Sequence, residues 1–181
     1  MTGAGPVRSL DAMRNDEARQ AQGSRTARTA RTARTAAIIA GMLFAAIAGL
    51  HGLWAVGITW PFGDKEALSQ TVFGSPASTF PPPVATLAVT VLLGGAALVV
   101  TGRGGVWGGW MPRWVFTAGT WAVATVLLLR AALYGPAAIG SDDINRTWEL
   151  ALFTPLCILL GLLCVVVALS DARSRRLSPM P

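Results

Sequence analysis

Four long apolar segments, separated by short polar stretches, dominate the pattern of hydrophobic and polar positions along the chain. A helix that crosses the roughly 30 Å hydrocarbon core of a bilayer needs about 20 residues. Strands are disfavoured, because in lipid a spanning segment has to satisfy its own backbone hydrogen bonds. The pattern therefore predicts an all-α integral membrane four-helix bundle, with spans at about residues 36–58, 84–101, 114–135 and 150–169.

The second apolar segment is the shortest of the four, and it contains Gly94 and Gly95. It forms either a thin span or a longer one that takes in flanking residues. The run Pro81-Pro82-Pro83 stiffens the chain just before it, because proline is not tolerated in a helix interior. We therefore expect this run to mark the start of the second span.

The composition supports membrane insertion and a single folded unit. Of the 181 residues, 52% are hydrophobic and 13% are charged, whereas globular domains carry about 25% charged residues. The length suits one bundle and no second domain. We expect a basic cytoplasmic arm over residues 1–35, a four-span domain over 36–170 and a basic cytoplasmic tail over 171–181.

Basic residues gather on one side of the predicted membrane domain. The loops on the other side carry only Lys65 and Arg146. The positive-inside rule then places both termini in the cytoplasm, and an even number of spans also puts the termini on one side. We therefore predict a multi-pass protein of a bacterial inner (cytoplasmic) membrane. The basic residues of the cytoplasmic side are Arg19, Arg25, Arg28, Arg31 and Arg34 in the arm, Arg103 and Arg113 in a loop, and Arg173, Arg175 and Arg176 in the tail.

The arginine-rich arm has low complexity, because a Thr-Ala-Arg unit repeats over residues 26–34. A period of three rotates around a helix and makes no single basic stripe. We expect a disordered cationic arm that orients the first span and contacts anionic lipid, at about 1 kcal/mol per arginine near the surface. No nucleic acid is expected as a partner, since no aromatic interleaving or recognised binding fold accompanies the charge.

The third apolar segment contains a cation, Arg130, which marks a candidate functional site. A charge at this depth is costly unless it is paired or hydrated. Arg130 either extends to the outer headgroups or pairs with a carboxylate, for which Glu149, Asp142 and Asp143 are candidates. The outer side otherwise avoids positive charge, which favours pairing.

Depth brings further polar residues to the level of this arginine. His51 and Arg130 lie about 6–8 Å outward of the midpoints of their spans, at 1.5 Å per residue. Glu149 lies at the outer mouth of the fourth span, and Trp54 and Tyr134 follow His51 and Arg130 at same-face spacings. We expect one pocket open to the outer leaflet. Its candidate catalytic residues are His51, Arg130 and Glu149, and its candidate binding residues are Trp54, Tyr134 and Trp148.

Two of these residues also have purely structural interpretations. His51 is either part of the pocket or a polar residue hydrogen-bonded between helices. Glu149 is either part of the pocket or a carboxylate favoured by the start of a helix. The dipeptide Thr154-Pro155 lies nearby and permits a kink, because proline frees a backbone carbonyl.

The remaining chemistry-bearing residues predict neither a cofactor nor a metal. Cys157 and Cys164 lie on one face of the fourth span, about 10 Å apart along a helix axis. They cannot form a disulfide with each other at that separation, and buried cysteine is usually a small hydrophobe. The single histidine has no second ligand at a useful spacing, so we expect no metal site. No cofactor motif is present.

Three stretches of the chain resemble the domain of unknown function 3995 family of small bacterial membrane proteins. They are residues 51–57, 129–131 and 148–157, and the resemblance extends over about residues 40–170. Its most specific parts are the His-x-x-Trp pair and the Thr-Pro-Leu-Cys tetrad. The resemblance implies a four-helix fold and a conspicuous polar trio at His51, Arg130 and Glu149, but no activity.

The chain departs from the family pattern at two places. The family usually has aspartate where this chain has Glu149, so the carboxylate is retained with one more methylene. The family often has Phe-Ala-Arg just ahead of that position, where this chain reads Asn145-Arg146-Thr147. Both departures bear on the geometry of a shared site.

Three function classes fit these residues. The first is a binding or assembly protein without turnover, in which the trio locks the helices or holds a ligand. Its partners would be the bilayer, a lipophilic small molecule or a second copy in a homodimer. The second is a small membrane-embedded enzyme of isomerase or cyclase type, which would use an acid/base mechanism on a lipophilic substrate. The third is a small transporter, which ranks last because Glu149 lies far from the midplane.

Overall fold

The computed structural model of the chain describes residues 10–140 and 145–176, and it contains helices and no strand within those ranges. Four of its helical segments are long and apolar enough to cross a membrane, which confirms the predicted all-α, four-span class. The helices are α1 (Leu10–Ala55), α2 (Lys65–Phe73), α3 (Pro83–Arg103), α4 (Arg113–Gly140), α5 (Arg146–Trp148) and α6 (Thr154–Arg176), with a 3₁₀ turn η1 (Ala77–Thr79) and a π-helical turn η2 (Glu149–Phe153).

The spans are longer than the apolar segments that predicted them. Helix α3 takes in flanking residues and begins at Pro83, a position in the first turn where the missing N–H of proline costs nothing. Helix α4 continues through Pro136 to Gly140. The fourth span begins at Arg146 and passes through α5 and η2 into α6.

The expectation of a disordered arm is wrong from Leu10 onward, because α1 is one helix of 46 residues. Alanine and arginine have high helix propensity, and the spanning part of α1 already supplies the nucleus from which a helix propagates. The hydroxyls of Thr26, Thr29 and Thr32 donate to carbonyls four residues back at 2.9–3.0 Å. The rest of the predicted arm, residues 1–9, lies outside the described residues.

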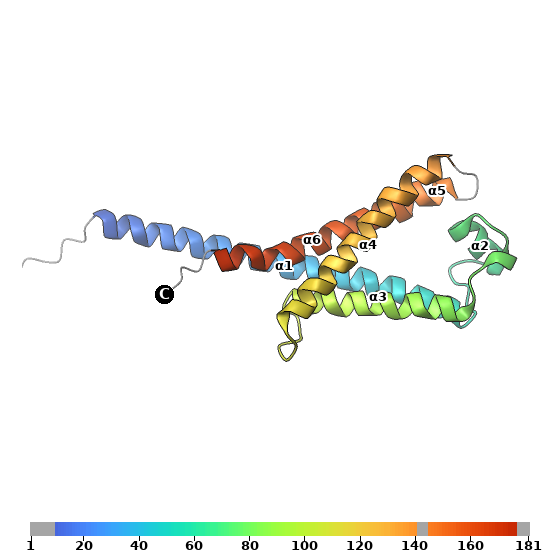
Figure 1. Cartoon of the computed structure of the whole chain (residues 1–181), viewed down its shortest axis with the longest axis horizontal. Helices are drawn as coiled ribbons and strands as arrows, with labels where there is room; N and C mark the ends of the chain where they lie inside the picture. Colours follow the sequence, from blue (N-terminus) through green and yellow to red (C-terminus); the bar gives the residue numbers. More distant parts are fainter. Residues whose placement is uncertain (1–9, 141–144, 177–181) are drawn as a thin grey trace, which may run out of the picture.

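The four long helices form two antiparallel pairs (Figure 1). Helix α1 packs against α3 and α4 packs against α6, and the pairs meet through contacts of α1 with α6 and of α3 with α4. The shared core lies toward the arginine-rich ends of the spans. Its buried members are Ala36, Ala37, Ala40, Phe44, Ala96, Val100, Ala124, Leu160, Cys164 and Val167.

Glycines let the helices approach closely around this core. A Cβ added to Gly104 would meet the Cβ of Ala37, and one added to Gly119 would lie 2.7 Å from a methyl of Val99. Small residues at such seams are typical of membrane helices, since close approach increases van der Waals contact. We call this part of the bundle, up to Phe44 in α1, the inner half.

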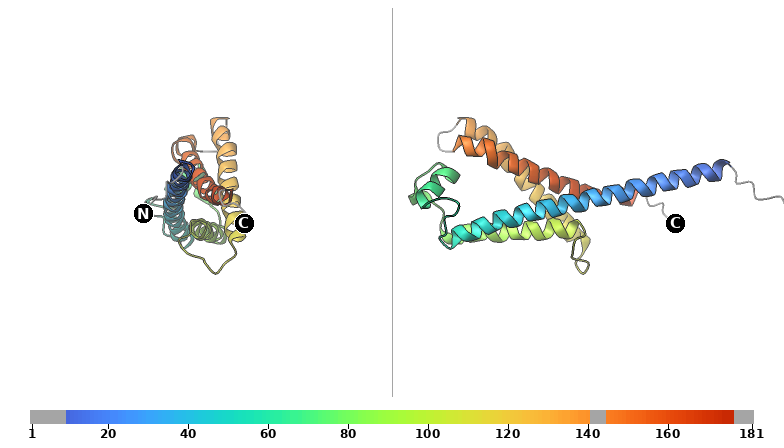
Figure 2. Two further views of the ribbon diagram at one scale, coloured as in Figure 1. Left: turned by 90° about the vertical axis from the view of Figure 1, so that its left-hand side faces the viewer. Right: turned by 180° about the vertical axis from the view of Figure 1, so that it is seen from behind.

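Beyond the core the two pairs diverge (Figures 1 and 2). We call this part, which holds the second half of the α1 span and the beginning of the fourth span, the outer half. The loops beyond it are joined by a hydrogen bond of 3.0 Å from the Asn145 side chain to the carbonyl of Gln70. Helix α2 in the first loop is capped by the Asp64 carboxylate, which accepts from the N–H of Ala67 at 2.7 Å.

Candidate functional site

After the short helix α5, the fourth span passes through the π-helical turn η2, in which the N–H of Thr154 bonds to the carbonyl of Glu149. Pro155 explains this wide turn. Its ring lacks an N–H and would clash with the carbonyl of Ala151 in a regular α-helix. Turns of this kind occur often at functional sites. Glu149 sits at the start of the turn and is 4% exposed, so its carboxylate is held inside the protein.

Glu149 forms a two-pronged ion pair with Arg130 of α4. One guanidinium nitrogen, Nη1, lies 2.9 Å from Oε1, and the other, Nη2, lies 3.1 Å from Oε2. Two parallel charge-assisted bonds fix geometry as well as adding strength. The side chain of Arg130 is 35% exposed and that of Glu149 is 5% exposed. Arg130 therefore pairs with one of its predicted partners. The other two, Asp142 and Asp143, lie outside the described residues.

Three neighbouring side chains complete the surroundings of the pair. The Thr154 hydroxyl donates to Oε1 of Glu149 at 2.8 Å. Nη1 of Arg130 also donates to the Cys157 sulfur at 3.7 Å, and its guanidinium lies 5.0 Å from the centre of the Tyr134 ring. Cation–aromatic contacts of this kind add to the attraction that holds an arginine in place. Both carboxylate oxygens and both terminal nitrogens thus have partners.

A glycine on α4 makes room for this cluster. A Cβ on Gly135 would lie 3.3 Å from the Cγ2 of Thr154 and 3.5 Å from its hydroxyl oxygen. Because Gly135 carries no side chain, α4 can approach the Thr154 side chain closely at the level of the ion pair. The close approach and the ion pair therefore belong to the same helix contact.

His51 lies on the other helix pair and has its own contacts. Its Nδ1 is 2.9 Å from the carbonyl oxygen of Ile47, and its ring lies 4.9 Å from that of Trp54. Trp54 in turn donates from its indole nitrogen to the carbonyl of Trp60 at 3.0 Å. Within the described residues, no hydrogen bond, ion pair or ring contact joins His51 to Arg130 or Glu149. The structure therefore brings two of the trio together.

His51 nevertheless lies on the same face of α1 as the core residues. Ala40, Phe44 and Ala48 are buried on one face of the helix, and spacings of three and four residues continue that face to His51. His51 is partly buried and lies just past the last core residue of α1. The core-facing side of α1 thus continues into the outer half, where His51 lies on it.

The predicted binding residues behave differently from one another. Tyr134 contacts the guanidinium of Arg130, and Trp54 contacts His51. Trp148 is 42% exposed, and its backbone N–H reaches the side-chain oxygen of Asn145 at 3.5 Å. None of the contacts found within the described ranges joins Trp148 to the ion pair.

Sequence reasoning missed the roles of Thr154 and Cys157. The two residues stand in the Thr-Pro-Leu-Cys tetrad, but regular helical spacing does not place Thr154 beside Glu149, five positions earlier. The π-helical turn adds the extra residue that brings the hydroxyl onto the carboxylate. The proline after Thr154 is the one sequence signal that could have indicated this.

The arrangement is better suited to holding helices together than to holding a metal. No group of three His, Cys, Asp or Glu side chains that could bind a metal ion occurs among the residues that the structure describes. Cys157 and Cys164 are free thiols. The carboxylate and guanidinium join α4 to the start of the fourth span through a partly buried, bidentate contact.

A family model described as "Protein of unknown function (DUF3995)" matches residues 43–164. This range covers two thirds of the chain and includes His51, Arg130 and Glu149, and it confirms the resemblance expected from the sequence. No curated protein and no solved structure matches the chain.

Proposed function

We propose, for a chain that belongs to the DUF3995 family of proteins of unknown function, that it binds a small lipophilic molecule in its outer half without turning it over. The ion pair of Arg130 with Glu149 acts as a lock that keeps α4 and the fourth span together as one wall of the site. His51 and Trp54 belong to the facing wall on α1. We also place both termini in the cytoplasm and the chain in a bacterial inner membrane, following the distribution of its arginines.

The bidentate ion pair is the observation that carries this proposal. A general acid or base needs an oxygen that can reach the substrate proton. Both oxygens of Glu149 already accept hydrogen bonds, from Arg130 and Thr154. Opening this contact would leave a charge without its partner in an apolar region, which is costly. A structural lock uses the contact as it stands, and catalysis by Glu149 would have to break it.

The place where the four-helix core ends is evidence that a ligand binds between the helix pairs. The core stops at Phe44 in α1, and the pairs diverge beyond it (Figure 1). His51 continues the core-facing stripe at that level. Binding sites for small molecules are mostly apolar, with a few placed polar groups that orient the ligand. A partly buried histidine at the end of an apolar stripe suits the polar end of an otherwise lipophilic molecule.

One observation favours an enzyme as the second candidate function. The carboxylate of Glu149 lies at a π-helical turn next to a free thiol, Cys157. A rotation of the Glu149 side chain away from Arg130 would free the carboxylate for proton transfer. An isomerase or cyclase of acid/base type would use such a movement.

Neutral, nearly isosteric substitutions distinguish the lock from the enzyme. We expect Glu149→Gln and Arg130→Gln to lower the unfolding temperature in detergent, because each leaves the other partner of the ion pair without its counter-charge. We expect His51→Gln to keep that temperature while it reduces the lipophilic molecule that copurifies, as measured by solvent extraction and mass spectrometry. If Glu149→Gln and Arg130→Gln both unfold at the wild-type temperature, the lock is refuted.

Cysteine labelling tests where His51 lies. In a background that carries Cys157→Ala and Cys164→Ala, H51C is expected to react with a membrane-impermeant maleimide added outside the cell. The matched variant A40C, in the core of the same helix, is expected to remain unlabelled, because Ala40 is fully buried. Labelling of H51C from the cytoplasmic side alone, or labelling no faster than A40C, would refute the outward-facing site.

A further inference from the structure

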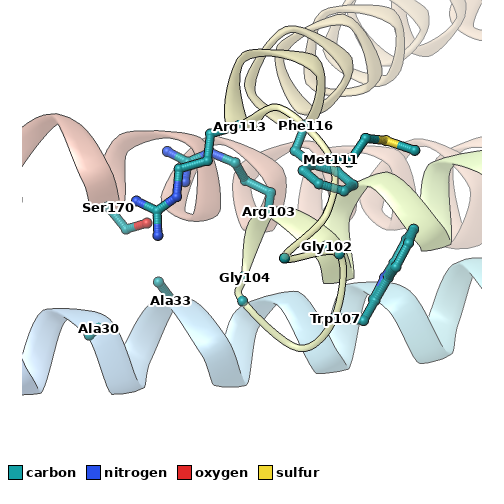
Figure 3. A pocket seen from close by; sticks show the side chains of 13 residues that line it. Ala30, Ala33, Gly102, Arg103, Gly104, Trp107, Met111, Arg113, Phe116 and Ser170 are labelled. Carbon is teal, nitrogen blue, oxygen red and sulfur yellow. The ribbon is translucent and has the colours of Figure 1, made fainter.

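The arginine-rich end of the bundle contains a cavity of about 480 Å³ where α3 ends and α4 begins (Figure 3). Its polar side chains have interactions of their own. Nη2 of Arg103 donates to the carbonyl of Ala168 at 3.1 Å, and the Ser170 hydroxyl donates to the carbonyl of Val167 at 2.8 Å. Arg113 is engaged as well. This end of the bundle therefore uses its polar groups in contacts within the protein, and His51 in the outer half differs from it.

The hydrogen bond of His51 fixes which nitrogen of its ring carries a proton. Nδ1 is 2.9 Å from the carbonyl oxygen of Ile47. A carbonyl oxygen only accepts hydrogen bonds, so Nδ1 carries the proton and is the donor. The neutral imidazole has a single ring proton, and its second nitrogen is then an acceptor. Nε2 of His51 is therefore an acceptor.

This acceptor has no hydrogen-bond partner in the part of the chain that the structure describes, residues 10–140 and 145–176. The ring is partly buried, and Nε2 is not enclosed by protein atoms. A molecule that covers Nε2 without donating to it would leave a polar atom without water and without a bond, which is costly. The position therefore selects for a molecule that carries a donor.

Trp54 lies beside His51 and has no donor left for a ligand. Its ring is 4.9 Å from the His51 ring and tilted by 47°. Its indole N–H donates to the carbonyl of Trp60 at 3.0 Å, and its ring also packs on Phe62, with ring centres 6.3 Å apart. Trp54 is thus held by two contacts and offers a ligand an apolar ring face.

Helix α3 likewise offers a methyl group to this part of α1. A Cβ added to Gly52, the residue after His51, would lie 3.6 Å from the Cγ2 of Thr90. The Thr90 hydroxyl donates to the carbonyl of Thr86 at 3.0 Å, within its own helix. A ligand whose polar end only accepts, such as a ketone or an ether, therefore gains no hydrogen bond from Trp54 or Thr90.

We infer that the molecule bound in the outer half is a lipophilic alcohol whose hydroxyl donates to Nε2 of His51. The inference rests on the proposed function, because it specifies the ligand of the same site. The hydroxyl supplies the donor that Nε2 lacks, and the apolar body of the alcohol suits the ring face of Trp54 and the methyl of Thr90. An ether of the same size lacks that donor and binds more weakly.

A matched pair of probes tests the inference on the full chain in detergent. Dodecanol and dodecyl methyl ether share one hydrocarbon chain and one oxygen, but only the alcohol donates. Each is added at the same mole fraction in the micelle, and bound probe is counted by native mass spectrometry. We expect dodecanol to bind about fivefold more tightly, the ratio that one neutral hydrogen bond supplies. Equal binding would overturn recognition of a hydroxyl and leave the proposed function standing, whereas binding of neither probe would overturn both.

Two variants assign this preference to His51. His51→Phe keeps a ring beside Trp54 but removes Nε2, and it is expected to reduce the preference for dodecanol to less than twofold. Met42→Phe introduces the same side chain at an exposed position of the same helix, where Met42 is 68% exposed, and it is expected to keep the fivefold preference. An undiminished preference in His51→Phe would overturn the assignment.

Nitrogen NMR of the wild-type protein tests the tautomer without any substitution. The chain has a single histidine, so isotopic labelling of histidine nitrogen reports this ring alone when the purification tag contains no histidine. We expect the proton on Nδ1, a bare Nε2, and an Nε2 signal that moves on addition of dodecanol but not of its ether. A proton on Nε2, or on both nitrogens, would overturn the inference.

Discussion

The two halves of this bundle are held together by different forces. In the inner half, four helices share one core of alanines, one phenylalanine, one cysteine and aliphatic residues, with glycines at the closest seams. In the outer half the helices remain in pairs, and the contact between α4 and the fourth span is an ion pair with a hydroxyl and a thiol around it. Small residues and polar groups are the two means by which helices associate in lipid, where burying apolar surface against protein gains little.

The comparison teaches where a bundle can be modified without unfolding. Close packing in the inner half leaves little room for a change in volume, because interiors are packed as densely as organic crystals. The outer half depends on a few polar atoms, so a change of charge there matters more than a change of size. Four experiments test this comparison, in order from the largest expected effect to the smallest.

Removal of the largest core side chain should cost most. Phe44 is the last buried core residue of α1 and is 1% exposed. Phe44→Ala is expected to lower the free energy of unfolding in detergent by about 3 kcal/mol, because it leaves a cavity that the helices cannot close. The same substitution at Phe73, an exposed residue of α2, is the control and should cost less than about 1 kcal/mol. Equal costs at the two positions would show that the inner half is not the packed core.

Loss of charge in the outer half should cost somewhat less. Glu149→Gln leaves Arg130 without its counter-charge, and we expect a loss of about 2 kcal/mol. This is below the cost for a fully buried pair, because the Arg130 side chain is one-third exposed. The double variant Arg130→Met, Glu149→Leu removes both charges and should be more stable than Glu149→Gln alone. Thermal unfolding followed by tryptophan fluorescence measures the stability of both variants. A double variant that is less stable than Glu149→Gln would contradict the lock.

Adding one methyl group should distinguish a close helix contact from an open surface. Gly49→Ala, where a Cβ would meet nothing within 4 Å, should stabilise the helix by up to about 1 kcal/mol through propensity alone. Gly135→Ala gains the same propensity but presses on Thr154, so its unfolding temperature should be the lower of the two. If Gly135→Ala is as stable as Gly49→Ala, the contact between α4 and Thr154 is not close in solution.

The smallest effect is expected in the loop between α1 and α3, from a change of pH. The N–H of Ala77 and the side chain of Gln70 bond to the Glu66 carboxylate, and the former above all holds its pKa below the ordinary value of 4.5. A lowered pKa in the folded state means that this stabilisation is complete above about pH 4.5 and is lost as the pH falls through the lower pKa. The protection of the Ala77 amide against hydrogen exchange, relative to the intrinsic rate at each pH, should fall over that window. Glu66→Gln should remove this pH dependence. If the pH dependence persists in that variant, another titrating group causes it.

The apolar segments were sufficient to predict the four spans, because each span is long and its hydrophobicity is a property of local sequence. The helix ends were less predictable. Pro136 and the polar residues around Arg146 lie outside the apolar runs, yet hydrogen bonding continues the helices through them. The arm from Leu10 was assigned as disordered from its charge and repeats, whereas helix propensity and continuity with the first span govern its conformation.

The sequence by itself determined the class of the protein, the family and the cost of a cation at Arg130, since these depend on composition, pattern and depth. It also indicated Glu149 as one of three partners. Only the tertiary structure decided which groups meet. The choice of Glu149, the contacts of Thr154 and Cys157 and the separation of His51 all depend on a π-helical turn and on how two helix pairs diverge. These contacts depend on the approach of two helices or on an irregular turn, and a regular helical periodicity in the sequence does not predict them.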